Sequence, residues 1–383
     1  MNTLALCEVT NILMGQSPPS SSYNSTGKGL PFFQGKADFG DVHPKVRMYC
    51  TQPARVAETN DILISVRAPV GPTNINLVKS CVGRGLAAIR SGSNVDHKYL
   101  FYFLRFYEPK LAQIGKGLTF EAINRDDLES IQFPLIKLSE QKRIAAILDK
   151  ADRLRRTRRY AQQLSDTFLQ SVFVEMFGDP VKNPKEWPVM PLRQIAEKFS
   201  DGPFGSYLKT EHYTHSGVRV IRLQNIGIGE FLDDDKEYIS ESHFETLLKH
   251  GCVPGDVIVG TMGDPNLRAC ILPNTIHEAL NKADCVQIRP DSTKAKAEYI
   301  CWLLNLPHTL FLATGMILGQ TRSRISMGRL AELQVPIAPL ALQEKFALIV
   351  QRFERLRAQQ REAARQAEHL FQTLLHRAFR GEL

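Results

Sequence analysis

At 383 residues, with 43% hydrophobic and 23% charged residues, the chain is long enough for two or three packed domains, and its composition excludes a largely disordered protein. No apolar run is long enough for a membrane span, the N-terminus lacks signal-peptide features, and seven scattered cysteines without a CxxC pair suit a reducing compartment, so we expect a cytoplasmic protein. A net charge of +8 favours a polyanion or an acidic protein as partner.

The first globular region is predicted to cover residues 1–138. Its β-branched and aromatic runs, among them PFFQ, DILISV and AAIR, are short and are separated by clusters of Gly, Pro, Ser and Asn. This pattern predicts strands and loops with a few helices, and therefore an α+β domain. Residues 179–340 have the same texture and predict a second domain of this kind, which includes its own N-terminal linker.

A long helix is predicted after each domain, over residues 139–178 and 341–383. Residues 139–177 and 341–380 contain neither Gly nor Pro, and each helix carries a net charge of +3. With heptad position a at Ile144 and d at Ile147, both segments are apolar at their ends and polar in the middle, at Arg158 and Gln360. The two helices are expected to pair as an antiparallel coiled coil with pseudo-twofold symmetry. Alternatively, each helix packs on its own domain.

An internal repeat organises the chain. A single offset of 202 residues aligns Gly117 with Gly319 and Phe177 with Phe379, and it aligns QKRIAAILDKADRLRR from Gln141 with QEKFALIVQRFERLRA from Gln343. Upstream, NDILISV resembles GDVIVGT with a drifting offset. Because only two copies exist, the pattern indicates a duplicated unit of domain plus helix and not a solenoid.

The repeated phrase PLIKLSEQKRIAAIL, its echo PLALQEKFALIV, and the linker FGDPVKNPKEWPVMPL resemble the specificity (S) subunit of type I restriction-modification systems over essentially the whole chain. The resemblance implies that each globular domain is a target recognition domain that reads one half of a split DNA sequence. It implies that the paired helices form a spacer that docks two copies of a methyltransferase subunit, with motor and nuclease subunits in the full complex. The strong divergence of the two domains then predicts an asymmetric target.

Candidate DNA-binding residues are polar or cationic side chains on loops, where they can reach base edges and phosphates. In the first domain they are Ser17, Lys28, Gln34, Lys36, Arg67, Lys116 and Thr119. In the second they are Ser206, Tyr207, Lys209, Arg222, Gln224, Asn225, Arg268, Gln320, Thr321 and Arg322. For any single one of them an ordinary loop residue is the favoured interpretation, and base contact is expected only of some members of the set.

The clustered arginines of the helices allow three interpretations. They could form a phosphate-binding stripe, a solvated face that keeps the helices soluble, or a docking surface for methyltransferase subunits. We favour the last, with these candidate docking residues: Gln141, Arg155, Arg156, Gln343, Arg355 and Arg357.

The sequence lacks the enzyme motifs that a methyltransferase or an ATP-driven motor requires. It has no glycine-rich cofactor loop with an Asn/Asp-Pro-Pro-aromatic tetrapeptide and no GxxxxGK[ST] phosphate loop, and no metal site is predicted. The chain is therefore expected to be non-catalytic and to bind no cofactor, while S-adenosylmethionine, ATP and magnesium would bind partner subunits. Two alternatives stay open: a basic coiled-coil scaffold that joins proteins, and an enzyme built from scattered carboxylates.

Overall fold

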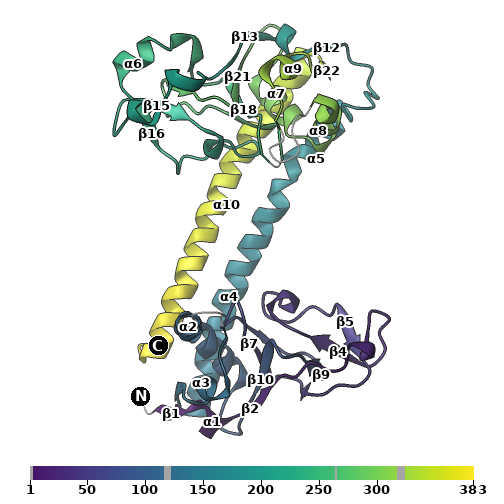
Figure 1. Cartoon of the computed structure of the whole chain (residues 1–383), viewed down its shortest axis with the longest axis vertical. Helices are drawn as coiled ribbons and strands as arrows, with labels where there is room; N and C mark the ends of the chain where they lie inside the picture. Colours follow the sequence, from purple (N-terminus) through teal and green to yellow (C-terminus); the bar gives the residue numbers. More distant parts are fainter. Residues whose placement is uncertain (1–2, 116–121, 264, 317–323) are drawn as a thin grey trace. The chain divides into compact units, whose positions relative to one another are not determined.

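The computed structural model describes residues 3–115, 122–263, 265–316 and 324–383 (Figure 1). The chain divides into two compact units. The first unit comprises residues 1–161 and 360–383, and the second comprises residues 162–359. Each unit therefore combines one globular region with a part of both long helices. This differs from the predicted division into four consecutive segments, because the helices bury their apolar faces in the cores of both units.

The first unit contains three sheets. Strands β1 (Thr3–Ala5) and β11 (Gln132–Pro134) pair, and a four-stranded sheet has the order β2-β10-β7-β8. The five-stranded sheet has the order β3-β5-β4-β9-β6. Their bounds are β2 Thr10–Met14, β3 Tyr23–Asn24, β4 Leu30–Phe33, β5 Met48–Cys50, β6 Val56–Ala57, β7 Ile62–Ser65, β8 Thr73–Ile75, β9 Ser80–Val82 and β10 Leu86–Ser91.

The second unit repeats this topology strand for strand. Its two-stranded sheet is β12-β22, its four-stranded sheet is β13-β21-β18-β19, and its five-stranded sheet is β14-β16-β15-β20-β17. In both units one pair of the five-stranded sheet is parallel, β4 with β9 and β15 with β20. The bounds are β12 Val189–Pro191, β13 Ala196–Asp201, β14 Tyr213–Thr214, β15 Val218–Ile221, β16 Glu237–Ile239, β17 Gly251–Cys252, β18 Val257–Gly260, β19 Arg268–Ile271, β20 Ala279–Asn281, β21 Cys285–Pro290 and β22 Gln334–Pro336. The duplication and the mixed α and β content predicted from the sequence are confirmed at the level of topology.

The helices include two long ones, α4 (Leu138–Asp166) and α10 (Leu340–Arg380). The first predicted long helix is interrupted, because Thr167 separates α4 from α5 (Phe168–Phe177). The remaining helices are α1 Leu6–Val9, α2 His97–Ile114, α3 Arg125–Glu129, α6 Glu241–Glu245, α7 Ala297–Leu304, α8 Pro307–Ala313 and α9 Met327–Ala331. Over the described residues, none of these helices combines the length and apolarity that a bilayer crossing requires.

The core of the first unit lies where α2 packs against segments of both long helices. Ile144 and Leu148 of α4 and Phe371, Leu375 and Ala378 of α10 are buried in one cluster with the aromatic face of α2. In the second unit Phe173 and Phe346 belong to one cluster, and their rings meet edge to face at 5.4 Å. Segments of α4 and α10 therefore share the core of the first unit, and α5 and α10 are in contact in the core of the second.

The predicted coiled-coil frame is wrong by one residue at its second position. Leu148 and Val350 are buried, whereas Leu154 and Leu356, which the predicted frame placed in the seam, are 42% and 56% exposed. The buried residues of the first helix form a stripe, in which Ile144 is followed by Leu148, four positions later, and then by Ala151, three positions later. The predicted frame had the spacing of three first and four second. Gln141 and Gln343 occupy this stripe, and their polarity concealed it in the sequence.

Candidate nucleic-acid interface

Two adjoining cavities in the first unit form one open groove, with volumes of about 660 Å³ and 520 Å³. They share Gln34, Gly35, Lys36 and Ala68 in their linings. We call the two together the first-unit groove. Four of the DNA-binding residues predicted from the sequence, Ser17, Gln34, Lys36 and Arg67, line it.

Strand direction explains why these residues meet. Strands β2 and β7 are both antiparallel to β10 and hence parallel to each other, and β4 is parallel to β9. The loops that follow these strands therefore emerge together in pairs. Backbone hydrogen bonds join them, since Gln16 N donates to Val82 O at 3.0 Å, Gly83 N to Phe33 O at 2.8 Å and Val66 N to Gly85 O at 3.0 Å.

Arg84, in the loop after β9, was missed by the sequence prediction although it lines the same groove. Its neighbours are glycines, and a Cβ on Gly85 would lie 2.3 Å from Gln34 O. Glycine is therefore required for the loop to pack this closely against Gln34. An arginine between two glycines after a strand was the sequence signal that could have identified it.

The groove carries uncompensated positive charge. The side chains of Arg67 and Arg84 are exposed and form no hydrogen bond or ion pair with any residue that the structure describes. Lys36 is exposed as well and interacts electrostatically with Glu108. Burial raises the pKa of Glu108 above its ordinary value, although the positive charges of Arg105 and Lys36 oppose that rise. Arg67 and Arg84, which have no partner carboxylate among the described residues, therefore give this concave site a positive charge that favours an anionic ligand.

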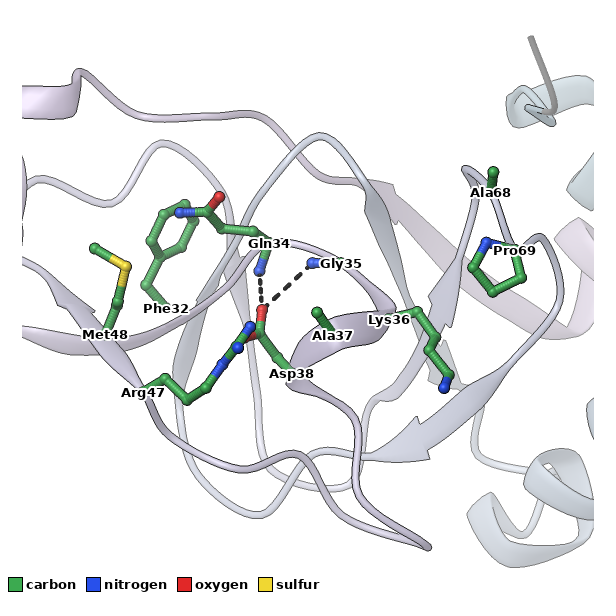
Figure 2. Close-up of a pocket in the computed structure, with 10 residues that line it drawn as sticks. All are labelled: Phe32, Gln34, Gly35, Lys36, Ala37, Asp38, Arg47, Met48, Ala68 and Pro69. Carbon is green, nitrogen blue, oxygen red and sulfur yellow. Dashed lines mark hydrogen bonds and ion pairs between the residues drawn. The ribbon is translucent and has the colours of Figure 1, made fainter. Parts of the chain in front are cut away.

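A buried carboxylate shapes the turn beneath Gln34 (Figure 2). Asp38 accepts hydrogen bonds from Gln34 N at 2.7 Å and Gly35 N at 3.4 Å, and Arg47 Nε donates to it at 2.8 Å. The Asp38 side chain is only 6% exposed. Arg47 therefore compensates a charge whose burial would otherwise be costly.

The second unit places different residues at the corresponding turn. Arg222 follows β15 as Gln34 follows β4, and Asn225 Oδ1 accepts a hydrogen bond from Arg222 N at 2.9 Å. The Arg222 guanidinium pairs with Asp235, and Glu237 lies 3.4 Å away, so hydrogen bonding to Asp235 raises the pKa of Arg222. Gln224 is exposed beside it.

The prediction that Asn225 contacts DNA is contradicted by its burial. Asn225 is fully buried, and its side-chain amide donates to Leu232 O and Asp235 O, each at 2.9 Å. Its hydrogen-bonding capacity is thus used inside the turn. The asparagine maintains the loop and does not face a ligand.

The other candidates lie elsewhere. Lys28 is exposed on the loop between β3 and β4, outside the groove lining, and Ser206, Tyr207 and Lys209 are exposed between β13 and β14. Lys209 pairs with Glu211 at 3.3 Å, and Arg268 is half-buried at the start of β19. The remaining candidates, Lys116, Thr119, Gln320, Thr321 and Arg322, lie outside the described residues.

Two predicted docking residues on the helices are buried instead. Gln141 and Gln343 are fully buried at the starts of α4 and α10, so the structure contradicts a surface role for them. Arg155 and Arg357 have side chains only 13% and 11% exposed. Arg156 pairs with buried Asp152 at 3.1 Å, and Arg355 is exposed.

The first part of the chain matches a family model, and the chain is similar to curated proteins. Residues 1–163 match the model of the type I restriction modification DNA specificity domain. Over 144 residues the chain is 53% identical to a putative type I restriction enzyme MjaX specificity subunit of Methanocaldococcus jannaschii, covering 37% of this chain and 34% of that protein. The MjaVIII specificity subunit of the same organism is 21% identical over 305 residues, covering 76% and 71%.

The fold has a solved counterpart. The type I restriction-modification S subunit from M. genitalium superposes with a TM-score of 0.62 at 15% identity, covering 98% of this chain and 95% of that one. At this identity the likeness shows the fold alone. The match to the MjaX protein spans about a third of that relative's length.

The two units have the same strand topology, which defines a duplicated protein. The cationic groove of the first unit is typical of a protein that binds a polyanion. Residues 1–163 are similar to the type I restriction modification DNA specificity domain, and the chain resembles curated specificity subunits of type I restriction enzymes.

Proposed function

We propose that the chain recognises a two-part sequence in duplex DNA, with each unit reading one half-site, and that it performs no chemistry itself. The observation that carries the proposal is the first-unit groove, in which exposed Arg67 and Arg84 have no partner among the described residues. Cations of this kind bind phosphates and can also read guanine edges. The match of residues 1–163 to a DNA specificity domain supports duplex DNA as the ligand.

The two half-sites are proposed to differ. The units share strand order and the register of the parallel strand pair, yet the residue directly after the strand is Gln34 in the first unit and Arg222 in the second. Direct readout of a base depends on the side chain that is presented to the groove of the duplex. One topology with different presented residues therefore favours an asymmetric, bipartite target.

The long helices are proposed to act as a coiled-coil spacer and as the docking region for two methyltransferase subunits. Ion pairs such as Arg155–Glu368 at 3.1 Å, and the stacked rings of Phe168 and Phe353 at 4.8 Å, support contact between the helices within each unit. Exposed apolar residues on the same helices, Leu154, Leu164, Leu348 and Leu356, offer contact area for a protein partner. S-adenosylmethionine, ATP and magnesium are proposed to bind the methyltransferase and the motor and nuclease subunits.

Selection from a randomised duplex pool tests the proposal. The full-length chain should enrich two short sequence blocks at a fixed separation, because each unit contacts one half-site. Arg67→Ala combined with Arg84→Ala should weaken binding and make the plot of log affinity against log salt concentration shallower by about 2, since roughly one phosphate contact is lost per cation.

The matched control removes the same charge outside the groove. Lys79 and Arg125 pair with Glu58 and Glu129 on the surface, so Lys79→Ala combined with Arg125→Ala should leave the salt dependence nearly unchanged. A scaffold protein would enrich no motif from the pool. Equal losses for the two double variants would point to bulk charge and against the groove.

A further inference from the structure

The side chain of Gln34 is free to read a ligand. It is exposed, it lines both cavities of the first-unit groove, and its amide forms no hydrogen bond with any residue that the structure describes. Figure 2 shows the side chain extending away from Asp38 while the backbone nitrogen of the same residue faces the carboxylate. The backbone is therefore fixed and the amide is presented.

Three interactions fix that backbone. Asp38 Oδ2 accepts from Gln34 N at 2.7 Å, Gly83 N donates to Phe33 O at 2.8 Å, and Gly85 packs against Gln34 O. Phe33, the preceding residue, is buried. Because the backbone of Gln34 is already ordered, binding has to order only its side chain, which reduces the entropy lost on binding.

The second unit has a related turn with a different residue after the strand. There Asn225 Oδ1 accepts the hydrogen bond from Arg222 N, as Asp38 Oδ2 accepts the bond from Gln34 N. Lys282 N donates to Ile221 O at 3.0 Å, as Gly83 N donates to Phe33 O in the first unit. The strand register places Gln34 and Arg222 alike, directly after β4 and β15, but the turn is one residue longer in the first unit. Asp38 follows Gln34 by four residues, whereas Asn225 follows Arg222 by three. In both units a side-chain oxygen of the turn anchors the backbone nitrogen of the residue after the strand, while that residue changes from glutamine to arginine, which is the pattern expected of a specificity position.

We propose that Gln34 is a specificity-determining residue of the first unit that recognises adenine, and that Asp38 is the residue that positions it. A glutamine amide has one donor and one acceptor group, which match N7 and the N6 amino group of adenine in the major groove. Arg67, Arg84 and Lys36 line the groove together with Gln34 and hold the adjacent phosphates. This inference rests on the proposed function, because it assigns one base position within the half-site of the first unit.

Base preference measured on duplexes tests the role of Gln34. With the full-length chain and a randomised duplex pool, wild type should select adenine at one position of one half-site. Gln34→Ala should lose roughly 5- to 150-fold of that preference, the range for one bidentate contact, and leave the other half-site unchanged. Gln34→Arg, which installs the second-unit residue, should shift the position towards guanine.

The repeat supplies a control for Asp38. Asp38→Asn keeps an oxygen acceptor for Gln34 N, as Asn225 does for Arg222, and should retain the adenine preference. Asp38→Ala removes the acceptor and should lose the preference while non-specific binding at low salt persists. A general loss of folding would instead reduce both and would appear as a lowered thermal unfolding midpoint.

The two proposals fail in different ways. If wild type enriches no motif, the proposed function is overturned, and the assignment of Gln34 falls with it. If wild type enriches a bipartite motif but Gln34→Ala and Gln34→Arg keep the same base at every position, DNA reading stands and the role of Gln34 is overturned.

Discussion

Asp152 is a fully buried carboxylate surrounded by three arginines of the first unit. Arg155, Arg156 and Arg105 approach it at 2.6, 3.1 and 3.4 Å. Burial lowers the pKa of Arg105, and the charge of Asp152 opposes that effect. Asp152→Ala would leave these cations partly buried without their common partner. We expect the free energy of unfolding of the first unit to fall by about 3 kcal/mol.

Urea-dependent hydrogen exchange of the α2 amides measures this change. The control is Asp149→Ala, one turn earlier, where the carboxylate is 21% exposed and pairs with Lys98 and Arg153 near the surface. That variant should cost less than about 1 kcal/mol. Equal effects of the two substitutions would show that burial of Asp152 is unimportant.

The sequence predicted residues of the candidate site only where a polar side chain follows a strand. Gln34, Lys36 and Arg67 were found because polar residues directly after strands are presented at sheet ends. Asn225 and Gln141 were misassigned because a polar side chain can equally satisfy buried backbone groups, and one sequence does not show which role it takes. Asp38 was missed because its role depends on Arg47 and on the turn backbone, which only the folded structure brings together.

At the scale of the elements, Gln141 anchors the start of α4 to the loop before α2. Its Oε1 accepts from Asp96 N at 2.9 Å, and its Nε2 donates to Asn94 O and Ile136 O at 2.9 and 2.8 Å. Gln141→Ala would leave these buried groups without partners, so we expect a loss of about 3 kcal/mol from the stability of the first unit.

Gln343 makes the same three kinds of bond in the second unit, to Lys296 N, Lys294 O and Ala338 O. This gives a reciprocal control, because both tryptophans of the chain, Trp187 and Trp302, lie in the second unit. Gln343→Ala should lower the urea midpoint of tryptophan fluorescence, whereas Gln141→Ala should leave it unchanged. A shift with both variants would mean that the two units unfold together.

The secondary structure was easier to predict than its exact limits. Absence of Gly and Pro marked both long helices, and short β-branched runs marked the strands. The interruption at Thr167 was missed, since a β-branched residue with a hydroxyl only weakens a helix and does not forbid it. The seam frame was missed because Gln141, Arg155 and their counterparts put polar side chains in the buried stripe.

At the scale of the whole molecule, the last part of the chain completes the unit formed by the first part. Residues 360–383 belong to the first unit, where Phe371 packs near Tyr102 with ring centres 6.1 Å apart and Phe379 packs near Phe103 at 5.5 Å. The chain therefore leaves the first unit, forms the second, and returns. The antiparallel pairing predicted from the sequence already implies such a return, but the packing of Phe371 and Phe379 on α2 was not predicted, because residues so far apart in sequence share no local pattern.

A chain truncated after residue 359 tests this return. The loss of buried Phe371 and Leu375 alone should cost the first unit about 6 kcal/mol, which is comparable with the whole stability of a typical domain. Limited proteolysis should then cut residues 3–115 rapidly, while the fluorescence midpoint of the second unit stays near its wild-type value. His369→Ala, on the exposed side of α10, should change neither result in the full chain. Continued protection of residues 3–115 after truncation would mean that the first unit is complete without the end of α10.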